Sequence, residues 1–356
     1  MPNKIDALFK EMVDFGASDL HLAEGQPPKI RVHGDMTPIR DVPMDHKEIV
    51  ELLSECCGAD RWKIFEERND YDWAYEMNEE TRFRCNYLKQ LHGYGAVFRV
   101  IPTKIPTIEE LGIPPVIKEF GKIKSGLVLV TGPTGSGKST TLASLIDFIN
   151  INYPRHIVTI EEPIEFVHGN KLSVITQREV PVDTPSFAMG LKASLRQDAD
   201  VVLVGEMRDL ETIALALTAA ETGLLVYGTL HTNNSQKTVD RIIDVFPSNQ
   251  QDQIRTMLAG SLRGVLAQLL FKRADGKGRL AVNEILICNS ATAAIIREGQ
   301  TAKLFDVLVG GKGIGMQLMD DAIMKLLNQG LVSPHEAYMK SIDKQRFTQF
   351  LSDDQV

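Results

Sequence analysis

The chain has 356 residues, 43% hydrophobic and 24% charged, which is typical of a soluble globular protein, and its length predicts two domains. Its net charge of −8 argues against a nucleic-acid partner held by bulk electrostatic attraction. The four cysteines form no Cys-x-x-Cys pair, which argues against a zinc module or a disulfide framework. The first residues are too polar for a signal peptide, and no apolar run reaches about 18 residues, so we expect no integral membrane segment. The cysteine pattern fits a reducing cytoplasm.

The first 101 residues predict an α+β domain. Apolar spacing from Ile5 to Val13 predicts one helix, and Asp45 can cap a second helix. Turns are predicted at Gly34-Asp35 and at 78–80. Alternating or apolar runs predict extended segments over 19–22, 29–33, 71–77, 82–87 and 96–101.

Three arginines lie on neighbouring predicted strands of this domain, at Arg82, Arg84 and Arg99. Side chains alternate along a strand, so Arg82 and Arg84 share one face of it while Phe83 and Cys85 face the other way. One interpretation is a solvated sheet face on which the arginines pair with acids, the commoner situation for surface arginine. The other is a phosphate-contacting face, because a planar guanidinium matches phosphate oxygens.

Residues 102–115 are predicted to be a stiff linker, because the stretch from Ile101 to Pro115 contains four prolines. Such a linker allows one domain to rotate against the other. The second predicted domain is 116–356, with a helical part from about residue 290.

This second domain contains the sequence Gly-Pro-Thr-Gly-Ser-Gly-Lys-Ser between a predicted strand, 126–131, and a predicted helix, 140–149. Strand, glycine-rich loop and helix form the context that a P-loop requires. Glycines let the backbone curl around a phosphate, and the helix N-terminus directs N–H groups at the anion. The pattern predicts that Lys138 reaches the β- and γ-phosphates of ATP and that the Ser139 hydroxyl binds Mg²⁺. The predicted nucleotide-binding residues are Gly132, Pro133, Thr134, Gly135, Ser136, Gly137, Lys138, Ser139 and Thr140.

Acidic side chains follow two further predicted strands. Glu162 and Glu165 follow the strand 156–160, and Glu206 follows the strand 200–204. Ligands of parallel sheets bind at the carboxyl ends of strands, so these acids are predicted near Mg²⁺ and the γ-phosphate, with Glu206 at the Walker B metal position. His231 follows another strand, 224–230. A lone histidine is more often structural, but this position favours a contact with the γ-phosphate.

The rest of the second domain is predicted to be mostly helical. The spacing of Ile254, Leu258, Leu262 and Leu266 predicts one long helix running towards Leu270. A strand is expected over 279–288, and short helices are expected over 316–327 and 333–341. Residues 352–356 are expected to fray.

Four motifs occur in an order that resembles the type II/type IV secretion ATPase superfamily. They lie at 132–139, 159–165, 195–209 and 228–233, and resemble its Walker A, Asp, Walker B and His boxes. The segments 82–86 and 97–102 are similar to the pilus-motor branch. Within this superfamily, the chain resembles the retraction ATPases of type IV pili. Its N-terminal region is short, it lacks a tetracysteine module, and its segment 291–298 is similar to their C-terminal signature. Two departures stand out: positions 292–294 differ from the retraction signature, and Glu162 replaces the usual Asp.

The resemblance implies an α/β fold with a RecA-like P-loop ATPase domain and a smaller N-terminal α+β, PAS-like domain. It implies a homohexamer that hydrolyses ATP with the help of Mg²⁺. The ATP would bind between the two domains of each subunit. The implied site has Glu165 or Glu162 polarising water, Glu206 and Ser139 at the metal, and His231 sensing the γ-phosphate. It also implies arginines donated by a neighbouring subunit, matching Arg82, Arg84 and Arg99.

The implied activity is pilus retraction against an inner-membrane platform protein, from the cytoplasmic face and without a nucleic-acid partner. The alternatives are a pilus-extension or type II secretion ATPase and an accessory retraction paralogue. A nucleic-acid motor and a non-catalytic scaffold are further alternatives, and the acidic balance and the intact acids argue against them.

Overall fold

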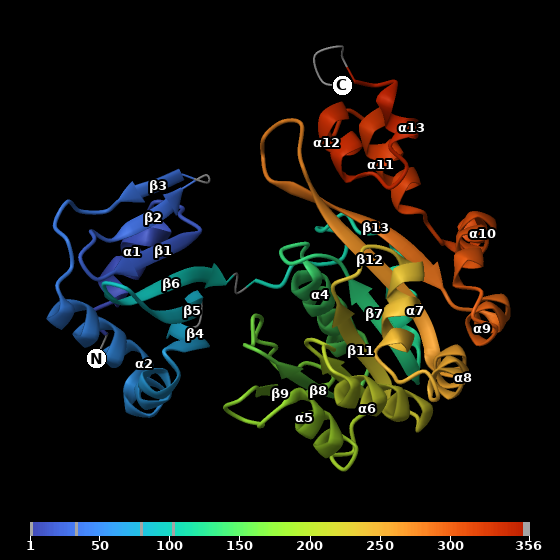
Figure 1. Ribbon diagram of the computed structural model, residues 1–356, viewed down its shortest axis with the longest axis horizontal. Helices are drawn as coiled ribbons and strands as arrows, with labels where there is room; N and C mark the ends of the chain where they lie inside the picture. Colours follow the sequence, from blue (N-terminus) through green and yellow to red (C-terminus); the bar gives the residue numbers. More distant parts are fainter. Residues whose placement is uncertain (1–2, 33–34, 79–80, 102–103, 352–356) are drawn as a thin grey trace. The chain divides into compact units, whose positions relative to one another are not determined.

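The computed structural model describes residues 3–32, 35–78, 81–101 and 104–351 (Figure 1). The chain divides into two compact units. Unit 1 contains Met1–Lys104 and the short segment Glu162–Val167, and unit 2 contains Ile105–Glu161 and His168–Val356. The turns predicted at Gly34-Asp35 and at 78–80 and the frayed end predicted over 352–356 fall wholly or partly outside the described residues.

Unit 1 is an antiparallel sheet of six strands with two helices. The strand order is β3-β2-β1-β6-β5-β4. Its elements are α1 (Asp6–Asp14), β1 (Asp19–Ala23), β2 (Lys29–Val32), β3 (Asp35–Pro38), α2 (His46–Arg68), β4 (Asp70–Asn78), β5 (Thr81–Gln90) and β6 (Gly93–Ile101). The sequence predicted both helices and the strands other than β3. Asp45 caps α2 as predicted, because its side chain accepts a hydrogen bond from the backbone N–H of Glu48 at 2.8 Å.

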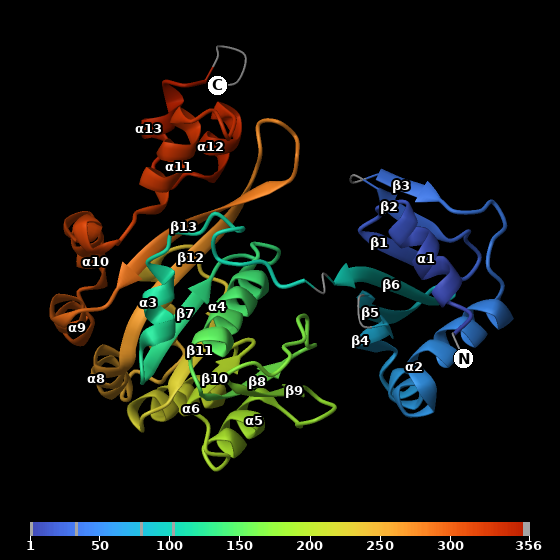
Figure 2. The same cartoon turned by 180° about the vertical axis from the view of Figure 1, so that it is seen from behind.

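The two helices of unit 1 pack on the same face of its sheet (Figure 2). Phe9 of α1 stacks on Phe83 of β5, and Phe65 of α2 meets Tyr87 of the same strand edge-to-face. Phe83 and Tyr87 are buried, as the alternation along this strand predicted, and Arg84 between them is partly exposed. The face of the sheet opposite the helices therefore carries the polar side chains.

Unit 2 is a sheet of seven strands in the order β13-β12-β7-β11-β10-β8-β9. β13 is antiparallel to β12, and the other neighbouring pairs are parallel. The strands are β7 (Gly126–Thr131), β8 (His156–Glu161), β9 (Val174–Glu179), β10 (Val201–Val204), β11 (Leu225–Leu230), β12 (Leu262–Lys272) and β13 (Arg279–Ile287).

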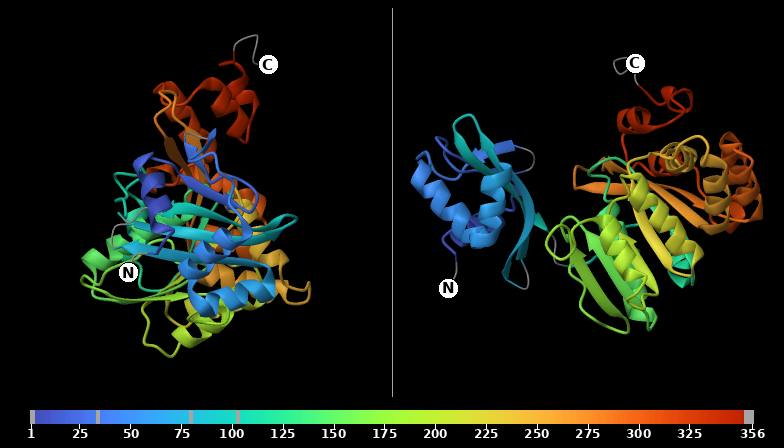
Figure 3. Two further views of the ribbon diagram at one scale, coloured as in Figure 1. Left: turned by 90° about the vertical axis from the view of Figure 1, so that its left-hand side faces the viewer. Right: turned by 60° about the horizontal axis from the view of Figure 1, so that its bottom comes forward.

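Helices cover both faces of this sheet, so its central strands are buried on both sides (Figure 3). Along β7, Leu127 and Leu129 belong to one apolar core while Val128 and Val130 belong to the other. The helices are α3 (Ile117–Lys122), α4 (Lys138–Asn152), α5 (Phe187–Ser194), α6 (Leu210–Glu221), α7 (Ser235–Asp244), α8 (Gln251–Ser261), α9 (Ser290–Arg297), α10 (Leu304–Gly310), α11 (Met319–Asn328), α12 (Pro334–Lys340) and α13 (Gln345–Thr348), with 3₁₀ turns η1 (Thr301–Lys303) and η2 (Gly311–Ile314). Within the described residues, no helix combines the length and apolar character needed to cross a bilayer.

The long helix predicted from Ile254 towards Leu270 is wrong. The helix α8 ends at Ser261, and the next residue begins β12, which pairs with β7 on one side and β13 on the other. Val265 and Leu266 point into opposite cores, so this strand is apolar on both faces. A strand buried on both faces has no polar alternation, and its apolar spacing also fits a buried helix.

Most of the predicted linker packs into unit 2. Ile108 and Ile113 are buried in the same core as α3 and α4, and the carbonyl of Pro106 accepts a hydrogen bond from Ser144 Oγ at 2.6 Å. The apolar residues between the prolines explain this, because their burial stabilises the segment against the sheet domain. Residues 102–103 lie outside the described part of the chain. The hinge function of this stretch stays a prediction.

Candidate active site

The glycine-rich loop joins the end of β7 to the start of α4. Gly132, Gly135 and Gly137 have φ values of 148°, 76° and 85°, which side chains disfavour. A Cβ at Gly132 would lie 2.2 Å from the backbone oxygen of Gln268, so the loop also needs glycine there for space. The helix α4 begins without a side-chain cap and without an acid in its first turn. Its first N–H groups and positive dipole end suit an anion.

Lys138 lies across this loop. Its Nζ donates hydrogen bonds to the carbonyl oxygens of Gly132 at 2.8 Å and Pro133 at 3.1 Å. Pro133, Thr134, Gly135 and Ser139 are exposed, whereas Ser136 is buried. A curled backbone, a helix N-terminus, an ammonium group and an exposed hydroxyl beside it are the donors that a phosphate with its Mg²⁺ requires, so these residues fit the predicted nucleotide and metal.

Glu206 and His231 meet at the carboxyl ends of the neighbouring parallel strands β10 and β11. His231 Nε2 lies 2.8 Å from Glu206 Oε1, and Arg208 Nε donates to the same oxygen. Burial alone would raise the pKa of Glu206, but the hydrogen bonds from Arg208 and His231 outweigh burial and hold that pKa below its usual value. Glu206 is therefore a carboxylate that only accepts hydrogen bonds, so His231 carries a hydrogen on Nε2 and donates it.

The backbone around Glu206 is fixed by the same two strands. Thr229 Oγ1 on β11 donates to the carbonyl of Gly205 at 2.5 Å, and the N–H of Met207 donates to the carbonyl of Thr229 at 3.0 Å. The sequence predicted that Glu206 and His231 share one edge, and the structure brings them together. The sequence did not single out Arg208 as a site residue, although it lies two positions after Glu206.

The two other predicted acids, Glu162 and Glu165, lie in the short segment that belongs to unit 1. Glu161, at the end of β8, stays in unit 2, where its Oε1 accepts from Thr159 Oγ1 at 2.6 Å and from Gln177 Nε2 at 3.2 Å. The chain thus leaves its own sheet immediately after β8 to place Glu162 and Glu165.

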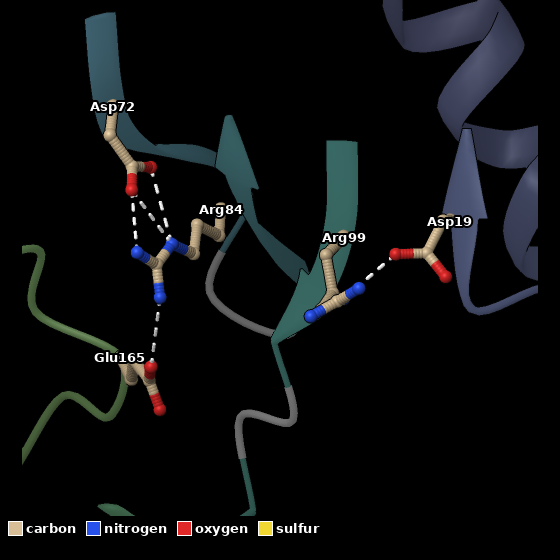
Figure 4. Close-up of polar contacts among 5 residues, drawn as sticks. All are labelled: Asp19, Asp72, Arg84, Arg99 and Glu165. Carbon is tan, nitrogen blue, oxygen red and sulfur yellow. Dashed lines mark hydrogen bonds and ion pairs between the residues drawn. The ribbon is translucent and has the colours of Figure 1, made fainter. Parts of the chain in front are cut away.

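Arg84 and Arg99 lie directly opposite each other on β5 and β6. Like charges in this position repel, and an acid from the adjacent strand on each side compensates them (Figure 4). Asp72 of β4 accepts from Arg84 Nε at 3.1 Å and from Arg84 Nη2 at 2.5 Å. Asp19 of β1 accepts from Arg99 Nε at 2.7 Å.

Arg84 also contacts one of the predicted catalytic acids. Its Nη1 lies 3.4 Å from Glu165 Oε1 (Figure 4). Asp19 is only 4% exposed, whereas the Arg99 side chain that it holds is 68% exposed. Arg82 shares the strand face of Arg84, and its Nε is buried with no hydrogen-bond partner among the described residues. The acid pairing expected for a solvated sheet face is therefore present at Arg84 and Arg99, and the phosphate role of all three arginines stays a prediction.

Comparison with known proteins agrees with this architecture. A family model described as "Type II/IV secretion system protein" matches residues 1–336. The type IV pilus retraction ATPase PilT of Pseudomonas aeruginosa is 48% identical over 92% of this chain and 94% of its own length. A twitching motility protein of Neisseria gonorrhoeae is 49% identical over 87% of this chain and 83% of its own length.

The fold is also similar to a solved structure. A crystal structure of the pilus retraction motor PilT with bound ADP superposes with a TM-score of 0.89, at 42% identity over 96% of this chain and 98% of the other. This match confirms the predicted α/β class, with a RecA-like ATPase domain and a smaller N-terminal domain, and the predicted resemblance to pilus retraction ATPases. The chain belongs to the type II/IV secretion system protein family.

Proposed function

We propose that this chain is an ATP-hydrolysing motor that drives retraction of type IV pili. The observation that carries the proposal is the set of groups that follow the carboxyl ends of three neighbouring strands. The P-loop follows β7, His231 follows β11 and Glu206 follows β10, and these strands are adjacent in the sheet. A phosphate cradle beside an ionised carboxylate and a hydrogen-donating imidazole is suited to phosphoryl transfer to water. The pilus-retraction part rests on the similarity to the Pseudomonas relative.

Each group has a role that follows from its charge and contacts. Lys138 exchanges its bonds to the loop carbonyls for the phosphates, and the N–H groups at the start of α4 bind the same anion. Ser139 and Glu206 would hold Mg²⁺, which neutralises developing charge on the phosphates when it is bound. His231, held by Glu206, presents its ring at the edge where the γ-phosphate is expected. Glu165 and Glu162 remain alternatives for polarising the attacking water.

We extend the proposal to a homohexamer in which an arginine of one subunit completes the site of the next. Among the candidate arginines, Arg99 is favoured over Arg84, because its side chain is 68% exposed against 40% for Arg84. Asp19 fixes the Nε of Arg99 and leaves the side chain in solvent. An arginine supplied in this way makes hydrolysis depend on assembly. The motor would act on the pilus platform protein at the cytoplasmic face of the inner membrane.

The test is a strain that makes type IV pili and lacks this chain, complemented with wild type, Lys138→Ala or Lys124→Ala. Lys124 is an exposed lysine of the same unit and serves as the matched control. We expect more surface pili and lost twitching in the deletion strain, both restored by wild type and Lys124→Ala but not by Lys138→Ala. Cells without pili would instead indicate an extension ATPase. Unchanged pili and twitching would contradict the role of main retraction motor and indicate a redundant, accessory retraction paralogue.

A further inference from the structure

Gln268 is a buried side chain of β12 that lies against the P-loop and has no part in the roles above. It is 1% exposed, and a buried primary amide is costly unless its donors and acceptor are paired. Its Nε2 donates to the carbonyl of Ser136 at 2.7 Å. Its Oε1 accepts from Thr141 Oγ1 at 2.8 Å and from Asn283 Nδ2 at 2.9 Å. The side chain thus connects β13, the P-loop and the first turn of α4.

The bond to Ser136 sets the direction of the next amide. The carbonyl and the N–H of one trans peptide point in opposite directions. Because the Ser136 carbonyl is drawn towards Gln268, the N–H of Gly137 points away from β12. Gly137 is the N-cap residue of α4, so this N–H lies at the end of the helix where the phosphate is expected.

The same residue approaches both ends of the glycine-rich loop. A Cβ at Gly132 would lie 2.2 Å from the backbone oxygen of Gln268, and a Cβ at Gly137 would lie 3.0 Å from its Nε2. The loop therefore rests on Gln268 at its first and last glycines. Its curl depends on this strand as well as on its own glycines.

Glutamine satisfies these contacts because it offers a donor and an acceptor at the same reach. Asparagine is one methylene shorter, methionine has neither group, and ionised glutamate has no donor for the Ser136 carbonyl. We propose that Gln268 is a positioning residue that holds the P-loop in its phosphate-binding conformation. This inference rests on the proposed nucleotide-binding function of unit 2 and is independent of the pilus.

The test compares Gln268→Met with wild type by equilibrium titration with fluorescent ADP and by steady-state ATP hydrolysis. Methionine has a similar volume and no strong hydrogen-bonding group, so it removes the three bonds without a large cavity. We expect the Kd for ADP and the KM for ATP to rise about 10-fold, as for a lost hydrogen bond to a charged group, and kcat at saturating ATP to change far less. The matched control is Asn150→Leu, which removes an equally buried amide that bonds Gly169 and Lys171. This control should lower stability but leave ADP affinity unchanged.

A second variant separates positioning from a loss of packing. The side chain in Gln268→Glu lacks the donor when ionised but regains one when protonated. Its ADP affinity should therefore recover towards that of wild type as the pH is lowered, with both proteins measured at each pH. Wild-type ADP affinity in Gln268→Met, or a pH-independent deficit in Gln268→Glu, would overturn the inference. Failure of wild type itself to bind ADP would instead refute the proposed function.

Discussion

Glu206 receives hydrogen bonds from two sides, through His231 and Arg208, and its contacts define the chemistry of the site at the scale of single residues. Its carboxylate stays ionised because these donors outweigh burial. An ionised carboxylate can be a ligand of a metal ion, and it also fixes the tautomer of His231. Removing its charge while keeping its shape tests the first of these roles separately.

We predict that Glu206→Gln abolishes turnover and leaves nucleotide binding largely intact. Glutamine can still accept the hydrogen bond from His231, so the fold of the site is preserved, but it is a poor ligand for Mg²⁺. Phosphate release should fall by at least about 100-fold, the cost of losing one transition-state contact. Fluorescent ADP binding should stay close to wild type. Turnover near the wild-type rate would show that the metal site has been placed on the wrong residue.

At the scale of elements, one side chain of β9 holds both ends of the segment that carries Glu162 and Glu165. Gln177 Nε2 donates to Glu161 before this segment, and Gln177 Oε1 accepts from the backbone N–H of His168 after it, at 2.8 Å. His168 is buried where the chain returns to unit 2. The excursion that places the candidate acids is thus fixed at its two ends.

Burial of His168 predicts a pH dependence of stability. Burial lowers the pKa of His168 from 6.5 to about 4, so the unfolded chain binds more protons between these values. The stabilising contribution is complete above pH 6.5 and is lost as the pH falls towards 4, by up to about 3 kcal/mol. We expect His168→Phe, which cannot be protonated, to lose this part of the pH dependence. Urea unfolding followed by circular dichroism gives the difference in free energy of unfolding between wild type and His168→Phe at pH 7.5 and at pH 5. The same difference at both pH values would contradict the prediction.

How far the sequence predicts these elements depends on whether their determinants are local. The P-loop was predictable because the glycines, Lys138 and the flanking strand and helix are consecutive. The pairing of Glu206 with His231 followed from strand ends of one parallel sheet. Gln268 was not predictable, because β12 is apolar on both faces and its spacing also fits a helix. Without that strand, nothing in the sequence connects position 268 with the loop.

The contacts of Arg84 show the same limit. Asp72, its partner on the neighbouring strand, lies 12 residues before it, within reach of a strand-pairing argument. Glu165 lies 81 residues after it, in a segment that leaves the sheet of its own unit. No periodicity in the sequence indicates that this segment leaves the sheet of its own unit. The burial of Ile108 and Ile113 was hidden in a similar way by the prolines around them.

At the scale of the whole molecule, the chain passes between the two units three times, after Lys104, after Glu161 and after Val167. The segment that carries Glu165 therefore belongs to unit 1, whereas the P-loop and Glu206 belong to unit 2.

We predict that Arg84→Ala lowers ATP hydrolysis without loss of hexamers. The substitution removes the partner of Glu165 on unit 1, while the sheet of that unit keeps its buried face. The matched control is Arg68→Ala, an exposed arginine at the end of α2. Phosphate release reports the rate, and sedimentation velocity reports assembly. A rate equal to that of the control would return Arg84 to a purely structural pairing with Asp72.

We propose that ATP hydrolysis by this chain retracts a pilus. Imaging of fluorescently labelled pili, on living cells that carry either wild type or Glu206→Gln as the sole copy, tests this most directly. We predict that fibres extend on both strains and that retraction is lost with Glu206→Gln. Retraction at the wild-type frequency in the Glu206→Gln strain, or fibres that never extend there, would contradict it.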